Sequence, residues 1–218
     1  MQTPGHVIIN LGLLGGGDRP RWTWPIIAGA LIPDLMMFWF YVWTKLIRGL
    51  PDGEIWRTTY FLDSWQNIFD LFNSIPLALV GLGLALYCRQ GGSHQGGSHQ
   101  GARPQGPRPQ PWAGPAIACF ASIIFHCLQD LPLHHDDGHR HFWPLSNFRF
   151  ASPVSYWDPN HYAIWGALFE VVCVVAATAL ILRWLKSPWG RGILIFLAVL
   201  YIALYLSLYG PTVIALVG

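Results

Sequence analysis

Residues 193–217 read ILIFLAVLYIALYLSLYGPTVIALV and hold no charged side chain. The hydrocarbon core of a bilayer is about 30 Å thick and takes about 20 apolar residues in a helix, the form that satisfies its own backbone polar groups. Four further stretches pass the same test, at residues 24–47, 68–88, 112–133 and 162–182. One more apolar stretch, residues 6–14, is too short to cross. The sequence therefore predicts an all-α integral membrane bundle of five transmembrane helices and a short N-terminal helix.

The composition agrees with this class of protein. Hydrophobic residues make up 53% of the chain and charged residues 11%, whereas about a quarter of an average soluble domain is charged. An ordinary water-soluble globule is excluded, and the expected partner is the lipid bilayer. The net charge of +2 supplies no broad basic surface, so we expect no nucleic-acid partner.

Two polar segments interrupt what we expect to be a single membrane domain over residues 1–218. Residues 91–110 are four pentads, GGSHQ, GGSHQ, GARPQ and GPRPQ, which predict a flexible low-complexity loop over residues 89–111. Residues 134–161 are predicted to form a His/Asp-rich loop outside the membrane. Most lysines and arginines lie in loops on the opposite side, so the positive-inside rule places this loop on the non-cytoplasmic side.

Several ionisable residues lie within the predicted spans, where burial in lipid is costly and usually marks a functional site. Asp34 lies about 15 Å into its span, and the short 6–14 helix returns His6 to a similar depth. These two side chains are therefore predicted to meet. Four others lie within about 13 Å of the opposite membrane surface: Asp70, His126, Asp130 and Glu170. His126 and Asp130 are four residues apart and share one helix face.

The densest group of polar residues follows directly, as HHDDGHRH at residues 134–141. Imidazole and carboxylate groups are ligands of zinc and manganese, and three protein ligands with one open position are typical of a catalytic site. His134, His135 and His139 are therefore further candidate ligands. No HExxH or equivalent spacing is present, so the run matches no fixed metal motif.

Each of these residues also has a structural interpretation. Asp70 is favoured by the positive end of a helix dipole if it lies near a helix N-terminus. Residues 134–141 are equally compatible with a solvated, pH-sensitive turn. Glu170 is compatible with a structural contact to a buried arginine or tryptophan.

The order of the motifs resembles a known family. Gly5-His6, Ile32-Pro33-Asp34, Asn73-Ser74 and a His126-to-Asp130 pair followed by Phe142-Trp143-Pro144 occur in sequence. This pattern, over residues 5–146, is similar to the membrane-bound metal-dependent hydrolases of the bacterial inner membrane related to YdjM, which are likened to zinc-dependent phospholipase C. Residues 62–76 and 130–157 are more similar to a bacterial subgroup of small membrane proteins. Some of these carry a cobalamin-biosynthesis label that nothing in the residues explains.

The resemblance implies a plasma (inner) membrane location and four metal ligands, His6, Asp34, His126 and Asp130. Where the broader family has His-Ser, this chain has Asn73-Ser74, so one ligand is missing. Three replacements remain open, namely His134, His135 and Asp70. The remaining alternative is that the hydrolytic site has decayed.

Together these patterns give three hypotheses. The first is a metal-dependent hydrolase of a lipid or phosphate ester that holds a divalent ion, zinc or manganese. Asp70 or Glu170 would accept the proton, and His134 to His139 would hold a second ion or gate entry. The second is a non-enzymatic carrier of ions or metals, and the third is a structural membrane protein whose buried pairs fix helix packing.

Overall fold

The computed structural model describes residues 1–17, 20–90 and 110–217, and within them the chain is helical, with no strand. The main helices are α1 (Thr3–Leu14), α2 (Thr23–Val42), α4 (Asp63–Phe72), α5 (Ile75–Gln90), α6 (Ala113–Asp130), α7 (Ala163–Leu182) and α8 (Pro188–Val217). Shorter pieces connect them: η1 (Pro20–Trp22), η2 (Trp43–Ile47), α3 (Asp52–Glu54), η3 (Ile55–Thr59) and η4 (Pro159–His161). The predicted low-complexity loop lies almost entirely outside the described residues.

Five helical stretches are long and apolar enough to cross a membrane: Thr23–Ile47, Asp63–Gln90, Ala113–Asp130, Ala163–Leu182 and Pro188–Thr212. Each overlaps one of the five predicted spans, and α1 is the predicted short helix. The prediction of an all-α membrane bundle is therefore confirmed. The chain has the architecture of a multi-pass helical membrane protein.

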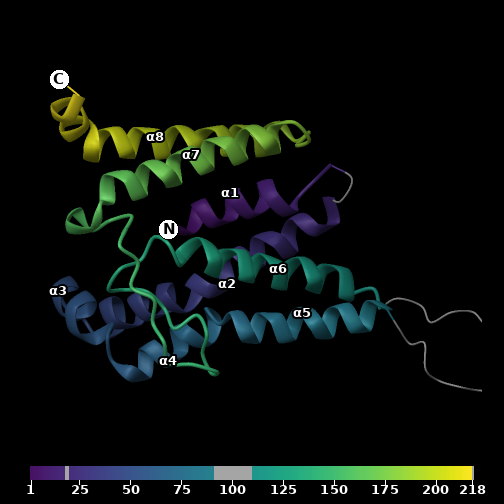
Figure 1. Ribbon diagram of the computed structural model, residues 1–218. Helices are drawn as coiled ribbons and strands as arrows, with labels where there is room; N and C mark the ends of the chain where they lie inside the picture. The colour runs from purple at the N-terminus through teal and green to yellow at the C-terminus, as the bar shows by residue number, and fades with distance from the viewer. Residues whose placement is uncertain (18–19, 91–109, 218) are drawn as a thin grey trace, which may run out of the picture.

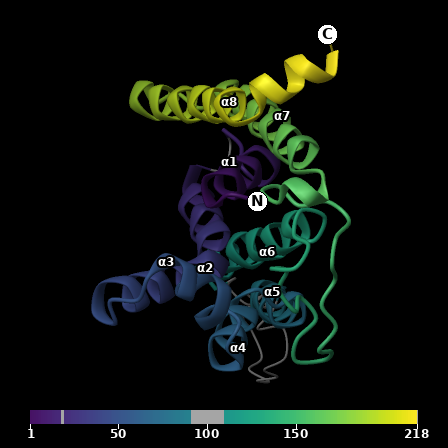
Figure 2. The same ribbon diagram turned by 90° about the vertical axis from the view of Figure 1, so that its left-hand side faces the viewer.

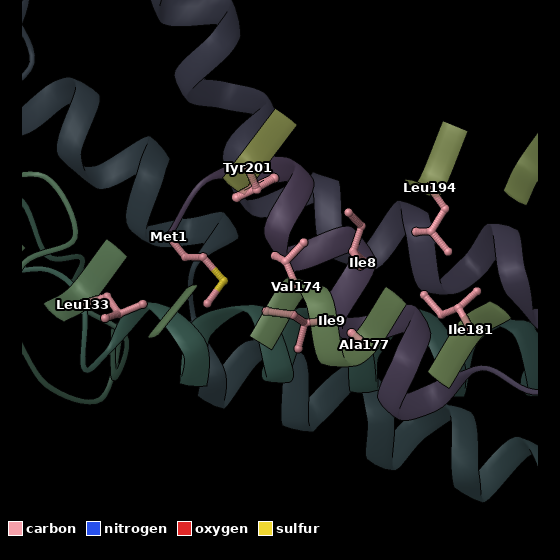
Figure 3. Packing of buried hydrophobic residues seen from close by; sticks show 9 residues of the cluster. All are labelled: Met1, Ile8, Ile9, Leu133, Val174, Ala177, Ile181, Leu194 and Tyr201. Atoms are coloured by element: carbon pink, nitrogen blue, oxygen red, sulfur yellow. The ribbon is translucent and has the colours of Figure 1, made fainter. Parts of the chain in front are cut away.

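The short helix α1 lies in the middle of the bundle (Figures 1 and 2). It packs against α7 on one side and against α2 and α6 on the other, while α5 packs against α6, and α8 against α7. Nine residues from α1, α7, α8 and their neighbours form the apolar core around it (Figure 3): Met1, Ile8, Ile9, Leu133, Val174, Ala177, Ile181, Leu194 and Tyr201. A helix too short to span the membrane is thus buried among helices that do.

Small residues bring α2 and α6 into close contact. A Cβ atom at Gly29 would lie 2.2 Å from the carbonyl oxygen of Cys119, a separation that only glycine avoids. Small residues at such crossings are typical of membrane helices, whose association depends on close backbone packing. The tight crossing holds the Asp34 turn of α2 against the His126 turn of α6.

The second predicted span is broken into two helices at Asn73 and Ser74. Ser74 caps the start of α5, because its hydroxyl accepts a hydrogen bond from the Leu77 amide at 3.2 Å, and Pro76, the second residue of the helix, favours a helix start. The same break binds the chain between α6 and η4, here called the 131–158 segment. Ser74 donates to the carbonyl of Trp143, and the Ile75 amide donates to the carbonyl of His141 at 2.9 Å. The break therefore anchors this segment over one end of the bundle (Figure 1).

Candidate metal centre

Three helices bring the four family-implied ligands together. His6 comes from α1, Asp34 from α2, and His126 and Asp130 from α6. The imidazole rings of His6 and His126 are stacked with their centroids 3.6 Å apart, and His126 Nε2 lies 3.5 Å from Asp34 Oδ1. His6 and Asp34 therefore both contact His126, and within the described residues no hydrogen bond or ion pair joins them directly. All four side chains are buried.

The Asp130 carboxylate lies at the centre of this group. Its oxygens lie 3.0 Å from His6 Nε2, 3.1 Å from His126 Nε2 and 3.2 Å from His134 Nε2. The Met1 amino group also contacts it, at 3.0 Å. Asp130 is only 3% exposed, so a negative charge there needs compensation from its neighbours.

A single metal ion fits this arrangement. His6, His126 and Asp130 each offer a ligand atom, and these atoms lie within 4.8 Å of one another. Four ligands at 2.0–2.2 Å from a tetrahedral zinc ion lie roughly 3.4 Å apart. The contacts of Asp130 with His6 and His126 are close to this spacing. The buried group is therefore able to hold a metal ion.

The hydrogen bonding of His126 supports a cation in this place. Its Nδ1 lies 2.8 Å from the carbonyl oxygen of Ala30, which only accepts, so Nδ1 carries a hydrogen. Neutral His126 therefore directs the lone pair of Nε2 toward Asp34 and Asp130. Nε2 makes no hydrogen bond of acceptable geometry with the described residues, and neither ring nitrogen of His6 does. A lone pair facing two buried carboxylates is repulsive unless a metal ion or a second proton lies between them.

A polar contact one turn away aligns the two histidines. The Asn10 side chain donates to the Ser122 carbonyl at 2.9 Å and lies 2.8 Å from the Ser122 hydroxyl, which in turn donates to the Ile26 carbonyl. Asn10 is four residues after His6, and Ser122 is four residues before His126. Because residues four apart share a helix face, this contact holds His6 and His126 at the same level.

A pocket of about 970 Å³ opens beside the cluster. Its polar wall includes Asp34, Asp130, His134 and Asp137. The remaining lining residues come mainly from the start of α1, from α2, from the region of η3 and from the 131–158 segment: Met1, Gln2, Thr3, Pro4, Met37, Phe38, Trp56, Arg57, Tyr60, Phe61, Asp136, His139, Tyr156 and Trp157. Asp130 thus joins the buried group of His6, His126 and Asp130 to a cavity large enough for an organic ligand.

His134 lies between the pocket and the buried group of His6, His126 and Asp130. Its Nε2 faces Asp130, and its Nδ1 lies 3.0 Å from Asp137 Oδ2, which also accepts from the Trp157 indole at 3.0 Å. Burial and the Met1 amino group lower the pKa of His134, but Asp130 and Asp137 outweigh them and raise that pKa above its ordinary value. Burial raises the pKa of Asp137, but the bond to His134 outweighs it and lowers that pKa.

Asp70 and Glu170 lie outside the pocket lining. Asp70 accepts from the backbone amide of Arg140 at 2.9 Å and from its guanidinium, and His139 Nδ1 lies 3.6 Å away. This contact joins α4 to the 131–158 segment. Glu170 accepts from the Gln2 amide at 2.9 Å, which joins α7 to the start of α1.

His135 turns away from the cluster, although it is adjacent to His134. Its Nδ1 lies 2.6 Å from the Ser152 carbonyl, and its ring stacks on His161 at 3.5 Å. His139 lines the pocket but faces Asp70, outside the metal cluster. Of the three candidate ligands in the 134–141 run, the structure therefore brings only His134 to Asp130.

Asn73 occupies a buried position beside the α2 turn that carries Asp34. Its side chain donates to the carbonyls of Pro33 and Phe69, and its own carbonyl accepts from His141 Nδ1 at 3.0 Å. The residue that departs from the family pattern thus supports the site by contacts with the backbone. Of the replacements proposed for the missing ligand, His134 contacts Asp130, whereas His135 and Asp70 have other partners.

Several residues of the site, among them Thr3 and Trp157, were not predicted from the sequence. The Thr3 hydroxyl donates to Asp34 Oδ2, and the Trp157 indole holds Asp137. Thr3 precedes Pro4, a helix-start signal that places it near His6. The pairing of Trp157 with Asp137 has no local signal, because the two residues are 20 positions apart.

No family model, curated protein or solved structure matches this chain. The likeness to the YdjM-related hydrolases stays a prediction.

The contact of Asn10 with Ser122, which holds His6 and His126 at the same level, can be tested by mutation. Replacing Asn10 with Ala leaves buried partners on α6 without their hydrogen bonds, so we expect the free energy of unfolding to fall by about 1–3 kcal/mol. Thr178→Val is the matched control, because the Thr178 hydroxyl is buried on α7 without a hydrogen-bond partner. Thermal or denaturant unfolding in detergent measures both. Equal stability of N10A and the parent protein would contradict the role of this contact.

The 131–158 segment gives a pH test. Burial, and the neighbouring His139, lower the pKa of His141 from 6.5 to about 4. The unfolded chain therefore binds this proton at a higher pH than the folded chain. The stability that neutral His141 contributes is complete above pH 6.5 and is lost as the pH falls toward 4. Between these values, His141→Gln should lose less stability than the parent in thermal unfolding, and identical pH profiles would count against the assignment.

Proposed function

We propose that this protein is a membrane-embedded hydrolase that uses a divalent metal ion, zinc or manganese, to cleave a lipid or phosphate ester. One observation carries the proposal: the buried group of His6, His126 and Asp130 adjoins a 970 Å³ pocket, and Asp130 of that group belongs to the pocket lining. Contacts that only fix helix packing need no adjoining cavity. A ligand site does, and it is usually concave and mostly apolar with a few convergent polar groups.

The donor set agrees with these metals. The cluster offers imidazole nitrogens and carboxylate oxygens, which suit zinc and manganese. Cys127, the nearby buried thiol, donates instead to the Asn73 carbonyl at 3.3 Å. When bound, such an ion lowers the pKa of its water toward 7 and polarises the bond to be cleaved.

The chain's own residues orient and complete the site. The Ala30 carbonyl fixes the ring of His126, and the Thr3 hydroxyl holds Asp34. Such partners orient metal ligands and fix their protonation. The apolar pocket wall limits water around the reacting groups, which strengthens the electrostatic contacts within the site.

His134 is the residue best placed to accept the proton at Nε2. It lines the pocket, its Nε2 contacts Asp130 and lies 2.9 Å from the Met1 amino group, and Asp137 binds the opposite nitrogen of its ring. A carboxylate behind an imidazole is a common way to orient a general base. The sequence suggested Asp70 or Glu170 for this step, but neither is among the residues that line the pocket.

The metal prediction is direct. Purified protein should contain stoichiometric zinc or manganese by elemental mass spectrometry, and His126→Gln and Asp130→Asn should lose it because each removes a ligand. His135→Gln is the control, because its ring binds the Ser152 carbonyl and stacks on His161. Absence of metal above the buffer level in the parent protein, or equal metal in every variant, would overturn the proposed centre.

The catalytic prediction concerns His134. His134→Asn should lower kcat by about 10²- to 10⁴-fold, the usual contribution of a general base, while metal content stays near the parent value. Release of nitrophenol from bis(p-nitrophenyl) phosphate and p-nitrophenyl butyrate measures turnover. His135→Asn should retain activity. Stoichiometric metal with no turnover of either ester would count against a hydrolase and favour a metal carrier.

A further inference from the structure

The pocket has an apolar wall that reaches the outer surface of a membrane-spanning helix. Phe38 lies four residues after Asp34 on α2, so both share the helix face that lines the pocket. Phe38 is 54% exposed, and Phe61 and Trp56, from the same wall, are 45% and 42% exposed. Exposed aromatic side chains on a spanning helix and at its end face lipid chains and the membrane interface. This wall therefore continues from the metal cluster to the bilayer.

Two charged side chains of opposite sign belong to the lining of the pocket. Arg57 comes from η3 and Asp136 from the 131–158 segment, and both are exposed. Neither makes an ion pair or a side-chain hydrogen bond with the described residues, whereas Asp137 is bound by His134 and Trp157. The lining thus offers one cation and one anion that remain available to a ligand.

The geometry points to a zwitterionic phospholipid as the pocket's ligand, with its phosphate at Arg57, its amine at Asp136 and an acyl chain along Phe38 and Phe61. This inference rests on the proposed function, because the phospholipid would be the substrate of the proposed hydrolase. Charge complementarity selects the headgroup. Phosphatidylglycerol, an anionic lipid, would place its phosphate at Arg57 but would bring no cation to Asp136. A water-soluble phosphate ester would leave the apolar wall uncovered.

Lipid binding can be measured without turnover. Native mass spectrometry of the purified protein should show phosphatidylethanolamine bound in preference to phosphatidylglycerol at equal concentration. Free phosphoethanolamine, which has the headgroup and no chain, should bind more weakly than the lipid. Equal binding of the two lipids, or of the free headgroup and the lipid, would overturn the inference.

Matched variants locate the headgroup. Arg57→Gln should weaken phosphatidylethanolamine binding by about threefold to tenfold, as expected for loss of a charged hydrogen-bond partner at an exposed position. Asp136→Asn should reduce the preference for phosphatidylethanolamine over phosphatidylglycerol. Arg48→Gln and Glu54→Gln are the controls, because both residues are exposed in the same connection between α2 and α4 but lie outside the lining. Equal effects in variants and controls would contradict the headgroup assignment.

A second pair of variants locates the chain. Phe38→Ser should weaken binding of the lipid but not of free phosphoethanolamine, whereas Phe169→Ser, on α7 with 53% exposure, should weaken neither. An unchanged lipid affinity in F38S would contradict the chain path. Selective lipid binding by a protein that cleaves no ester would retain this inference and reject the hydrolase, so the two proposals fail separately.

Discussion

The hydrogen bond from His126 Nδ1 to the Ala30 carbonyl fixes the direction in which His126 Nε2 points at the centre of the bundle. When His126 is neutral, this bond engages its ring hydrogen with the backbone of α2, and Nε2 presents a lone pair to Asp34 and Asp130. The Met1 amino group compensates part of the charge on Asp130, but a lone pair between two buried carboxylates remains unfavourable without a metal ion or a second proton there. A metal ion bound there would turn this costly arrangement into a stable one, and the adjoining pocket gives it access to a ligand.

A helix too short to cross the membrane, α1, positions one of the buried histidines. Helix α1 lies between α7 and the α2–α6 pair, so its first turn delivers His6 into the interior (Figure 2). The contact of Asn10 with Ser122 sets its level, and Gly29 allows α2 and α6 to approach. The break at Ser74 anchors the 131–158 segment over the same end, where that segment contributes His134 to the pocket.

Much of the fold could be predicted from the sequence because most spans are continuous apolar runs whose length matches the bilayer, although the second is interrupted at Asn73 and Ser74. The helix rise predicted a similar depth for His6 and Asp34, and the structure places both beside His126 without a direct contact between them in the described residues. The partners of Asp70 could not be predicted, because its arginine lies 70 residues later and no local pattern joins them. Nor could sequence distinguish His134 from His135, which are adjacent and differ only in the direction that an irregular backbone gives each ring.

We propose that a metal ion, and not a second proton, occupies the space between His126 and the two carboxylates. X-ray absorption spectroscopy at the edge of the bound metal tests this proposal, because the spectrum reports the ligands of the metal. We expect nitrogen and oxygen ligands at about 2.0–2.2 Å with outer-shell scattering from two imidazole rings, and one ring fewer in His6→Ala. A metal surrounded only by oxygen ligands, or a spectrum that H6A leaves unchanged, would contradict it.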